Sequence, residues 1–229
     1  MVGPDEIETR LAELRRCIDR ALERAGREDE KIALVAVSKT FPAEYISAAI
    51  SYGITDIGEN RVQEFESKRP NIKGRARWHL IGHLQKNKIN KALKLFDMIQ
   101  SVDSYKLAQE ISNRAQTDVD ILIQINCSGE DSKFGFDLSE ARDQVLKISE
   151  LEHVSIKGLM TIGPFVDDEN IVRRSFHPVR EIFSDLKKHE TDRLKMDFLS
   201  MGMSNDFEWA IAEGANMIRV GSLIFGQRG

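Results

Sequence analysis

Cysteine is scarce in this sequence, with only Cys17 and Cys127 among 229 residues. Two cysteines cannot build a disulfide framework, and by themselves they cannot supply the ligands of a structural zinc site. Long apolar runs are also missing, since no stretch approaches the ~20 uninterrupted apolar residues that a membrane-spanning helix needs. The sequence therefore predicts neither a disulfide-stapled protein nor a membrane protein.

An excess of positive charge is missing too. Lys and Arg number 33 against 37 for Asp and Glu, which gives a formal net charge of -4. Nucleic-acid binding usually leaves a basic footprint, so we do not expect a nucleic acid as the main partner. Residues 1–10 carry three acids and no apolar core, which is unlike a secretory signal or an Arg-rich transit peptide. We therefore expect a globular protein of the cytoplasm.

Strand-like and helix-like segments alternate along the chain. An amphipathic helix is expected over 7–22, and the apolar run 32–37 is typical of a strand buried on both faces. Further strands are expected at 54–57, 77–81, 97–100, 119–125, 154–160, 198–201 and 217–220. Helices are expected between them, at 45–50, 61–68, 87–96, 104–115, 138–149, 169–188 and 206–212.

Eight strands separated by helices predict parallel strands joined by crossovers. This pattern predicts an α/β fold, a single (β/α)8 TIM barrel over residues 1–229 with an additional N-terminal helix. An open doubly wound sheet is the alternative, but it usually has fewer strands. No linker rich in Pro, Gly or Ser divides the chain, which favours one domain.

A lysine directly follows the first predicted strand. In barrels of this kind the functional residues lie at the carboxyl ends of the strands and in the loops that follow, and Lys39 stands at such a place. Partial desolvation there would lower the lysine pKa from about 10.4 and leave a neutral amine that can form a Schiff base with an aldehyde. The alternative is a surface lysine whose stem lies along the protein.

Polar residues also stand at the ends of the second and third predicted strands. Asn60 either points into the barrel mouth or caps the next helix. Alternation places His79 and His83 on one side of the third strand, but no neighbouring acid or cysteine supports a metal site. We expect His79 either to pack against a flat ligand or to be a hydrogen-bonded core histidine. Cys127 has no paired base nearby and is expected to be a small buried residue.

Glycine and serine follow the last two predicted strands. Ser204 comes after the seventh strand, and Gly221 and Ser222 come after the eighth. Loops at this place commonly bind phosphate in such barrels, although ordinary turns also use these residue types. Together with Lys39, an arginine on the last strand (Arg219) and a flat-ring contact, they fit a phosphorylated aldehyde ring. Pyridoxal 5′-phosphate (PLP) is the candidate.

The sequence resembles the pyridoxal-phosphate homeostasis protein family, which is related to the N-terminal barrel of alanine racemase. The resemblance covers nearly the whole chain and rests on six motifs. They are AVSKT (36–40), GEN (58–60), WHLIGHLQ (78–85), GLMT (158–161), LSMGMS (199–204) and RVGS (219–222).

The resemblance implies a role for each of seven residues in a PLP site. It implies that Lys39 forms the Schiff base with PLP and that Arg219 faces the pyridine nitrogen. It further implies that Ser204, Gly221 and Ser222 contact the phosphate. Asn60 and His79 are implied to line the pocket. We therefore expect a monomer or weak dimer that holds PLP without established turnover, with PLP-dependent apo-enzymes as candidate partners.

Two alternative functions stay open. A low-activity amino-acid racemase needs an acid or base on each face of the ring, and racemases take the second from a separate domain. This sequence ends at Gly229, soon after the last strand, and Tyr45, Tyr52 and Tyr105 fall on predicted helices. These observations favour binding without turnover. The second alternative is an interaction module that uses the four lysines within 86–94, which otherwise form a solvated helix face.

Overall fold

The protein is built around a closed ring of parallel strands. The computed structural model describes residue 3, residues 6–128 and residues 134–227. The ring consists of eight strands: β1 (Ala33–Val37), β2 (Asp56–Glu59), β3 (Arg77–Leu80), β4 (Met98–Val102), β5 (Val119–Asn126), β7 (Val154–Thr161), β8 (Leu194–Ser200) and β9 (Met217–Val220). They pair in this order, and β9 pairs with β1 to close the ring. The predicted (β/α)8 barrel is therefore confirmed.

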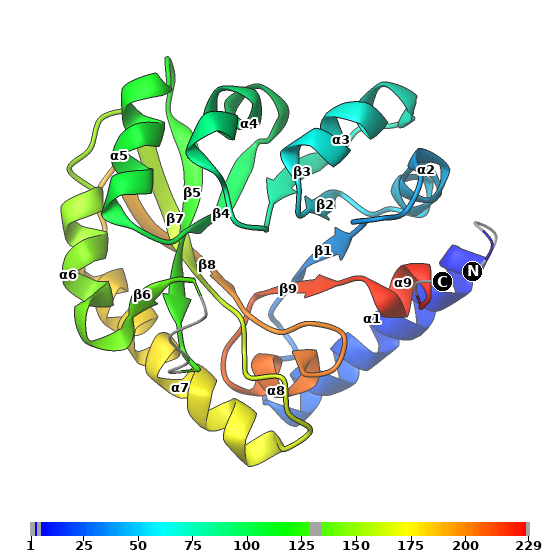
Figure 1. The fold of residues 1–229 in the computed structure, drawn as a ribbon. Coiled ribbons are helices and arrows are strands. Elements are labelled where there is room, and N and C mark those ends of the chain that lie inside the picture. Colours follow the sequence, from blue (N-terminus) through cyan, green and yellow to red (C-terminus); the bar gives the residue numbers. More distant parts are fainter. Residues whose placement is uncertain (1–2, 4–5, 129–133, 228–229) are drawn as a thin grey trace.

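Helices surround the ring (Figure 1). They are α1 (Ile7–Arg24), α2 (Ala43–Ser51), α3 (Val62–Lys68), α4 (Ile89–Leu95), α5 (Tyr105–Arg114), α6 (Leu138–Ile148), α7 (Glu169–Leu186), α8 (Phe207–Ala212) and α9 (Ser222–Phe225), with short 3-10 turns η2 (Arg69–Asn71), η3 (Lys86–Lys88) and η4 (Lys187–His189). A two-residue strand, β6 (Phe136–Asp137), pairs with β5 beside the ring. Among the described helices, none combines the length and the apolar character that crossing a bilayer requires.

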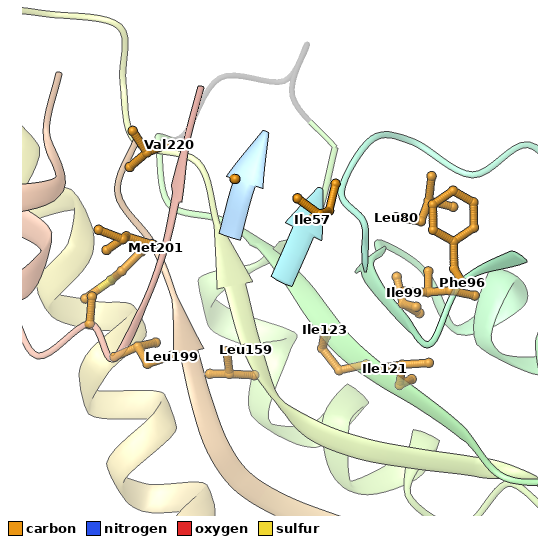
Figure 2. Packing of buried hydrophobic residues seen from close by; sticks show 14 of the residues in the cluster. Ile57, Leu80, Phe96, Ile99, Ile121, Ile123, Leu159, Leu199, Met201 and Val220 are labelled. Carbon is orange, nitrogen blue, oxygen red and sulfur yellow. The ribbon is translucent and has the colours of Figure 1, made fainter. Parts of the chain in front are cut away.

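The outer face of the ring is apolar because alternate strand residues point towards the helices. Neighbouring strands carry these residues in register, as in the row Leu80, Ile99 and Ile121 and in the row Ile123, Leu159 and Leu199. Each of these side chains is at most 1% exposed, and Figure 2 shows them among the buried hydrophobic residues that pack there. Burying one Leu or Ile side chain contributes roughly 1.5–3 kcal/mol, so these rows hold the helices to the sheet.

The inside of the ring is filled by a second, smaller set of side chains. An apolar cluster there consists of Val35, Met98, Leu122, Met160 and Met217. Buried polar side chains from β3, β4, β8 and β9 accompany it. The strands are therefore covered on both faces, as the continuous apolar runs of the sequence predict.

The N-terminal helix α1 covers the side of the barrel where α8 and α9 are short. Its residues at spacings of three and four, including Leu11 and Leu14, are buried, and α1 packs beside α8 and α9 (Figure 1). Arg27, which follows α1, donates to the carbonyl oxygen of Ala215 at 3.1 Å. Helix α1 thus covers the part of the barrel that the short helices α8 and α9 leave uncovered.

One predicted boundary is wrong by four residues. The strand expected at 198–201 begins at Leu194. Its first residues alternate, with Leu194 and Met196 buried and Lys195 and Asp197 more exposed. Such alternation is itself a strand pattern, but the two charges hide it from a search for continuous apolar runs.

Candidate functional site

A cavity of about 800 Å³ opens at the carboxyl ends of the strands. Its wall comes from segments that follow or end β1, β2, β3, β7, β8 and β9. Six of the seven predicted site residues lie on this wall, namely Lys39, Asn60, Ser204, Arg219, Gly221 and Ser222. The cavity has the size of a typical small-molecule site, which spans roughly 300–1,000 Å³.

Lys39 lies in a tight turn after β1. Phe41 N–H donates to the carbonyl oxygen of Ser38 at 3.0 Å, and Thr40 has a φ of 70°. A positive φ is rare for a β-branched residue and persists only where the surroundings enforce it. Here the Thr40 N–H donates to the Glu64 carboxylate, which holds the turn in this conformation.

A buried ion pair supports both sides of this turn. Lys68 Nζ lies 2.7 Å from Glu59 Oε1 and 2.8 Å from Glu64 Oε1. The same ammonium donates to the carbonyl oxygens of Ser38 and Phe41. Burial raises the pKa of Glu59 in spite of its contacts with Lys68 and Ser38. The backbone on either side of Lys39 is therefore fixed by charged groups that lie behind the cavity.

Arg219 presents a fixed, buried guanidinium to the cavity. It is 4% exposed, and its Nη1 and Nη2 donate to Ser200 Oγ at 2.6 Å and to the Thr161 carbonyl oxygen at 2.7 Å. Burial lowers the pKa of Arg219 to about 10, against the opposing effect of the Asp206 carboxylate. Arg219 therefore remains a cation at neutral pH.

Asp206 lies on the same wall, and the sequence reasoning missed it. Its carboxylate accepts from Met203 N–H. Burial raises the pKa of Asp206, while Met203 N–H and the charge of Arg219 act in the opposite direction. The one signal in the sequence is that Asp206 directly follows the Ser204 loop and precedes α8. Ile81 and Phe41 also line the cavity without having been singled out.

Hydroxyl and backbone groups meet where the loops after β8 and β9 come together. Gly221 N–H donates to Ser204 Oγ at 3.4 Å, and Ser222 begins α9 beside them. A Cβ added at Gly221 would lie 3.1 Å from the carbonyl oxygen of Val37, so a side chain there would crowd β1. This end of the cavity offers small donors and an accessible backbone, which suits an anion such as phosphate.

Asn60 contributes an acceptor to the wall. Within the described residues its Oδ1 is buried and has no hydrogen-bond partner. The helix cap is not Asn60 but Arg61, so the capping alternative does not apply. A Cβ added at Gly82 would lie 2.3 Å from the Asn60 carbonyl oxygen, which explains the glycine in the third-strand motif. The orphaned Oδ1 fits a ligand that donates a hydrogen bond.

His79 is not on the cavity wall. It is fully buried inside the barrel, with Nε2 at 2.8 Å from Asp56 Oδ1 and Nδ1 at 2.9 Å from Gln100 Nε2. The structure thus places it as a hydrogen-bonded core histidine and not as a pocket-lining residue. Ile81, two residues later and on the same side of the chain, lines the cavity instead.

Two other predictions concern residues outside the cavity wall. Cys127 is buried, as predicted. Of the four lysines within 86–94, Lys86 and Lys91 form ion pairs with Glu110 and Glu66. The described residues contain no group of three or more His, Cys, Asp or Glu side chains that could hold a metal ion.

The fold and the cavity define a class of proteins: parallel barrels with an amine, a guanidinium and a group of glycine and serine residues at one mouth. Residues 9–229 match the family model described as alanine racemase, N-terminal domain. A pyridoxal phosphate homeostasis protein of Aquifex aeolicus is 39% identical over 96% of this chain and 97% of its own length. The chain belongs to the family of pyridoxal phosphate homeostasis proteins.

Two solved structures extend the similarity to three dimensions. A protein from Bifidobacterium adolescentis described as unknown has a TM-score of 0.93 and 38% identity, and 98% of each chain is covered. PipY of Synechococcus elongatus, solved with PLP bound, has a TM-score of 0.82 and 35% identity, with 96% of this chain and 100% of PipY covered.

Proposed function

We propose that this protein binds PLP in the cavity and holds it as part of intracellular PLP homeostasis. The observation that carries the proposal is that Lys39, Arg219 and the loop residues Ser204, Gly221 and Ser222 share one cavity wall. The name of the Aquifex aeolicus relative and the PLP bound to PipY support it.

Each group on the wall fits one part of PLP. The Lys39 amine would hold the aldehyde carbon covalently, and its supported turn limits the directions from which it reaches the ring. The hydroxyls of Ser204 and Ser222 and the backbone at Gly221 would bind the phosphate. The orphaned Oδ1 of Asn60 would accept a hydrogen bond from the polar substituents of the ring.

Arg219 sets what the site does with PLP. When bound, PLP supplies an electron sink, whose strength depends on protonation of the ring nitrogen. A guanidinium has donors only, so the nitrogen that it faces stays unprotonated and the sink is weak. Because burial lowers the pKa of Arg219 only to about 10, the residue is still a cation and keeps this role at neutral pH. We therefore propose binding without turnover, with PLP-dependent apo-enzymes as recipients of the cofactor.

The proposal is tested by mapping where PLP attaches. Purified protein mixed with PLP should show a visible-range absorbance band. Reduction with borohydride followed by peptide mass spectrometry should then find the label on Lys39. Lys39→Ala should abolish the band, whereas Lys94→Ala, which removes an exposed lysine of α4, should leave it unchanged. Absence of the band, or a label spread over surface lysines, would contradict the proposal.

A low-activity amino-acid racemase is the second candidate, because the chain matches the alanine racemase N-terminal domain. Racemisation needs an acid or base on each face of the ring. The described cavity wall carries no tyrosine, and its ionisable side chains include Lys39 and Asp206. We expect the PLP-loaded protein to exchange α-deuterium from amino acids no faster than free PLP does. Exchange that exceeds this background and disappears in Lys39→Ala would establish the racemase instead.

A further inference from the structure

A single line of hydrogen-bonded side chains leads from the cavity into the barrel interior. Arg219 Nη1 donates to Ser200 Oγ at 2.6 Å, and Ser200 Oγ lies 2.8 Å from Gln100 Oε1. Gln100 Nε2 lies 2.9 Å from His79 Nδ1. His79 Nε2 in turn lies 2.8 Å from Asp56 Oδ1. We name these four residues behind Arg219, namely Asp56, His79, Gln100 and Ser200, the interior relay.

The interior relay and Arg219 together involve five strands, and the three central residues of the relay are fully buried. Its members lie on β2, β3, β4 and β8, and Arg219 lies on β9. His79, Gln100 and Ser200 are fully buried, whereas the Asp56 side chain is 18% exposed. Asp56 is the first residue of β2, whereas the cavity lies at the carboxyl ends of the strands. The relay therefore connects the cavity with the opposite end of the barrel.

The hydrogen bonds of the relay all point the same way. A guanidinium only donates, so Ser200 Oγ accepts from Arg219 and gives its one proton to Gln100 Oε1. The Gln100 amide then donates from Nε2, which makes His79 Nδ1 an acceptor. His79 consequently carries its proton on Nε2 and donates it to the Asp56 carboxylate.

A second contact fixes this direction. Gln100 Nε2 also donates to the sulfur of Met217 at 3.3 Å. Rotating the amide by half a turn would place its oxygen against both the sulfur and His79 Nδ1. It would also place the amide NH2 against Ser200 Oγ, so the Ser200 hydroxyl proton would lose Gln100 Oε1 as its acceptor, and buried polar networks that are only partly satisfied are costly. The relay is thus an ordered chain with one arrangement.

Opposite charges stand at the two ends of the relay. Burial acts to raise the pKa of Asp56, but hydrogen bonds from His79 and Thr55 outweigh it and hold that pKa below its ordinary value. Asp56 is therefore a carboxylate at neutral pH, and Arg219 is a cation. A run of aligned hydrogen bonds between an anion and a cation strengthens each bond of the run.

We propose that the interior relay positions the Arg219 guanidinium, so that binding of the PLP ring depends on a carboxylate at the far end of the barrel. Asp56, His79, Gln100 and Ser200 are then positioning residues. Among the described contacts, the Arg219 guanidinium makes one other hydrogen bond, from Nη2 to the Thr161 carbonyl oxygen. This inference rests on the proposed function, because PLP is the ligand whose binding would depend on the position of the Arg219 guanidinium.

The test is a double-mutant cycle between Asp56 and Arg219, which no described contact joins directly. Asp56→Asn keeps the shape and an acceptor but removes the charge. We expect it to raise the Kd for PLP about three- to tenfold, and to have less than a twofold effect when Arg219→Lys is already present. Asp103→Asn is the matched control, since the Asp103 carboxylate also contacts a histidine, His83 Nδ1 at 2.9 Å, and lies outside the relay.

A second readout needs no PLP. In 15N NMR spectra of the ligand-free protein, His79 should show a protonated Nε2 and an unprotonated Nδ1. The Arg219 side-chain signal should shift in Asp56→Asn and stay in place in Asp103→Asn. Should Asp56→Asn fail to fold, Ser200→Ala interrupts the relay without changing a charge and should shift the His79 signals.

The outcomes separate the two proposals. If the protein binds PLP but the effects of Asp56→Asn and Arg219→Lys multiply, and the Arg219 signal does not move, the relay is overturned and the proposed function stands. If the protein does not bind PLP but Asp56→Asn moves the Arg219 signal, the proposed function fails and the relay stands as a structural coupling. A His79 proton on Nδ1 would overturn the direction of the relay.

Discussion

At the scale of single residues, Lys68 is the most consequential side chain outside the cavity wall. Its ammonium is the only positive charge that the described contacts place against the fully buried Glu59 carboxylate, and it also donates to the carbonyl oxygens of Ser38 and Phe41 on either side of Lys39. One oxygen of that carboxylate, Oε2, has no partner among the described residues. Burial raises the pKa of Glu59, which shows that desolvation outweighs the attraction of Lys68.

Removing Lys68 should therefore destabilise the protein in a pH-dependent way. Lys68→Met leaves a buried, uncompensated carboxylate, which typically costs about 3–5 kcal/mol. A carboxyl whose folded pKa is raised contributes stability that is present below its unfolded pKa and is lost as the pH rises through the folded pKa. The deficit of Lys68→Met should be largest at pH 7 and should shrink towards pH 4, as chemical denaturation would measure.

The controls isolate the charge of Glu59. Glu59→Gln combined with Lys68→Met should recover part of the lost stability at pH 7, because no buried charge remains. Lys91→Met breaks an exposed pair with Glu66 and should change the free energy of unfolding by less than about 1 kcal/mol. A deficit of Lys68→Met that is the same at pH 4 and pH 7 would refute the assigned role of Glu59.

At the scale of secondary-structure elements, α1 acts as part of the barrel wall. Leu11 is fully buried where α1 packs beside α8 and α9. Leu11→Ala should lower the free energy of unfolding by about 2–5 kcal/mol, which is the usual cost of such a truncation in a core. Glu13→Ala, on the exposed face of the same helix, should be close to neutral. A deficit below 1 kcal/mol for Leu11→Ala would mean that α1 is dispensable.

The strands and the cavity loops could be predicted because each depends on neighbours in sequence. Buried parallel strands show as apolar runs, and parallel strands deliver their carboxyl ends to one mouth. This placed Lys39, Asn60 and Gly221 correctly on the cavity wall. Alternation predicts whether a side chain faces the inside or the outside of the barrel. It does not predict how far along the barrel axis that side chain lies from the cavity. His79 was therefore assigned to the right side of β3 and to the wrong level.

The contacts that support the site could not be predicted. Lys68 ends α3 and contacts Glu59, which lies nine residues earlier, before the helix begins. Gln100 on β4 contacts His79 on β3 and Ser200 on β8, which are 21 and 100 residues away in the sequence. None of these pairs has a spacing that a single strand or helix would predict. They become adjacent only when the ring closes.

At the scale of the whole molecule, ring closure creates the candidate site. The first and last strands lie side by side, with Ala33 in register with Met217 and Ala36 in register with Val220. Lys39 and Ser222, which follow these two strands, therefore share one cavity wall. The opposite seam of the same ring, between β4 and β5, is made by strands that are neighbours in the chain.

The pairing of β1 with β9 also fixes when the site can exist during synthesis. Proteins emerge from the ribosome amino end first, so Lys39 is made long before Arg219 of β9, which lines the same cavity. Pairings between such distant segments are slow, because a long loop must close before the contact is gained. A growing chain that still lacks β9 has Lys39 but neither Arg219 nor the loop that follows β9. The complete candidate site therefore exists only in a chain translated through its last strand.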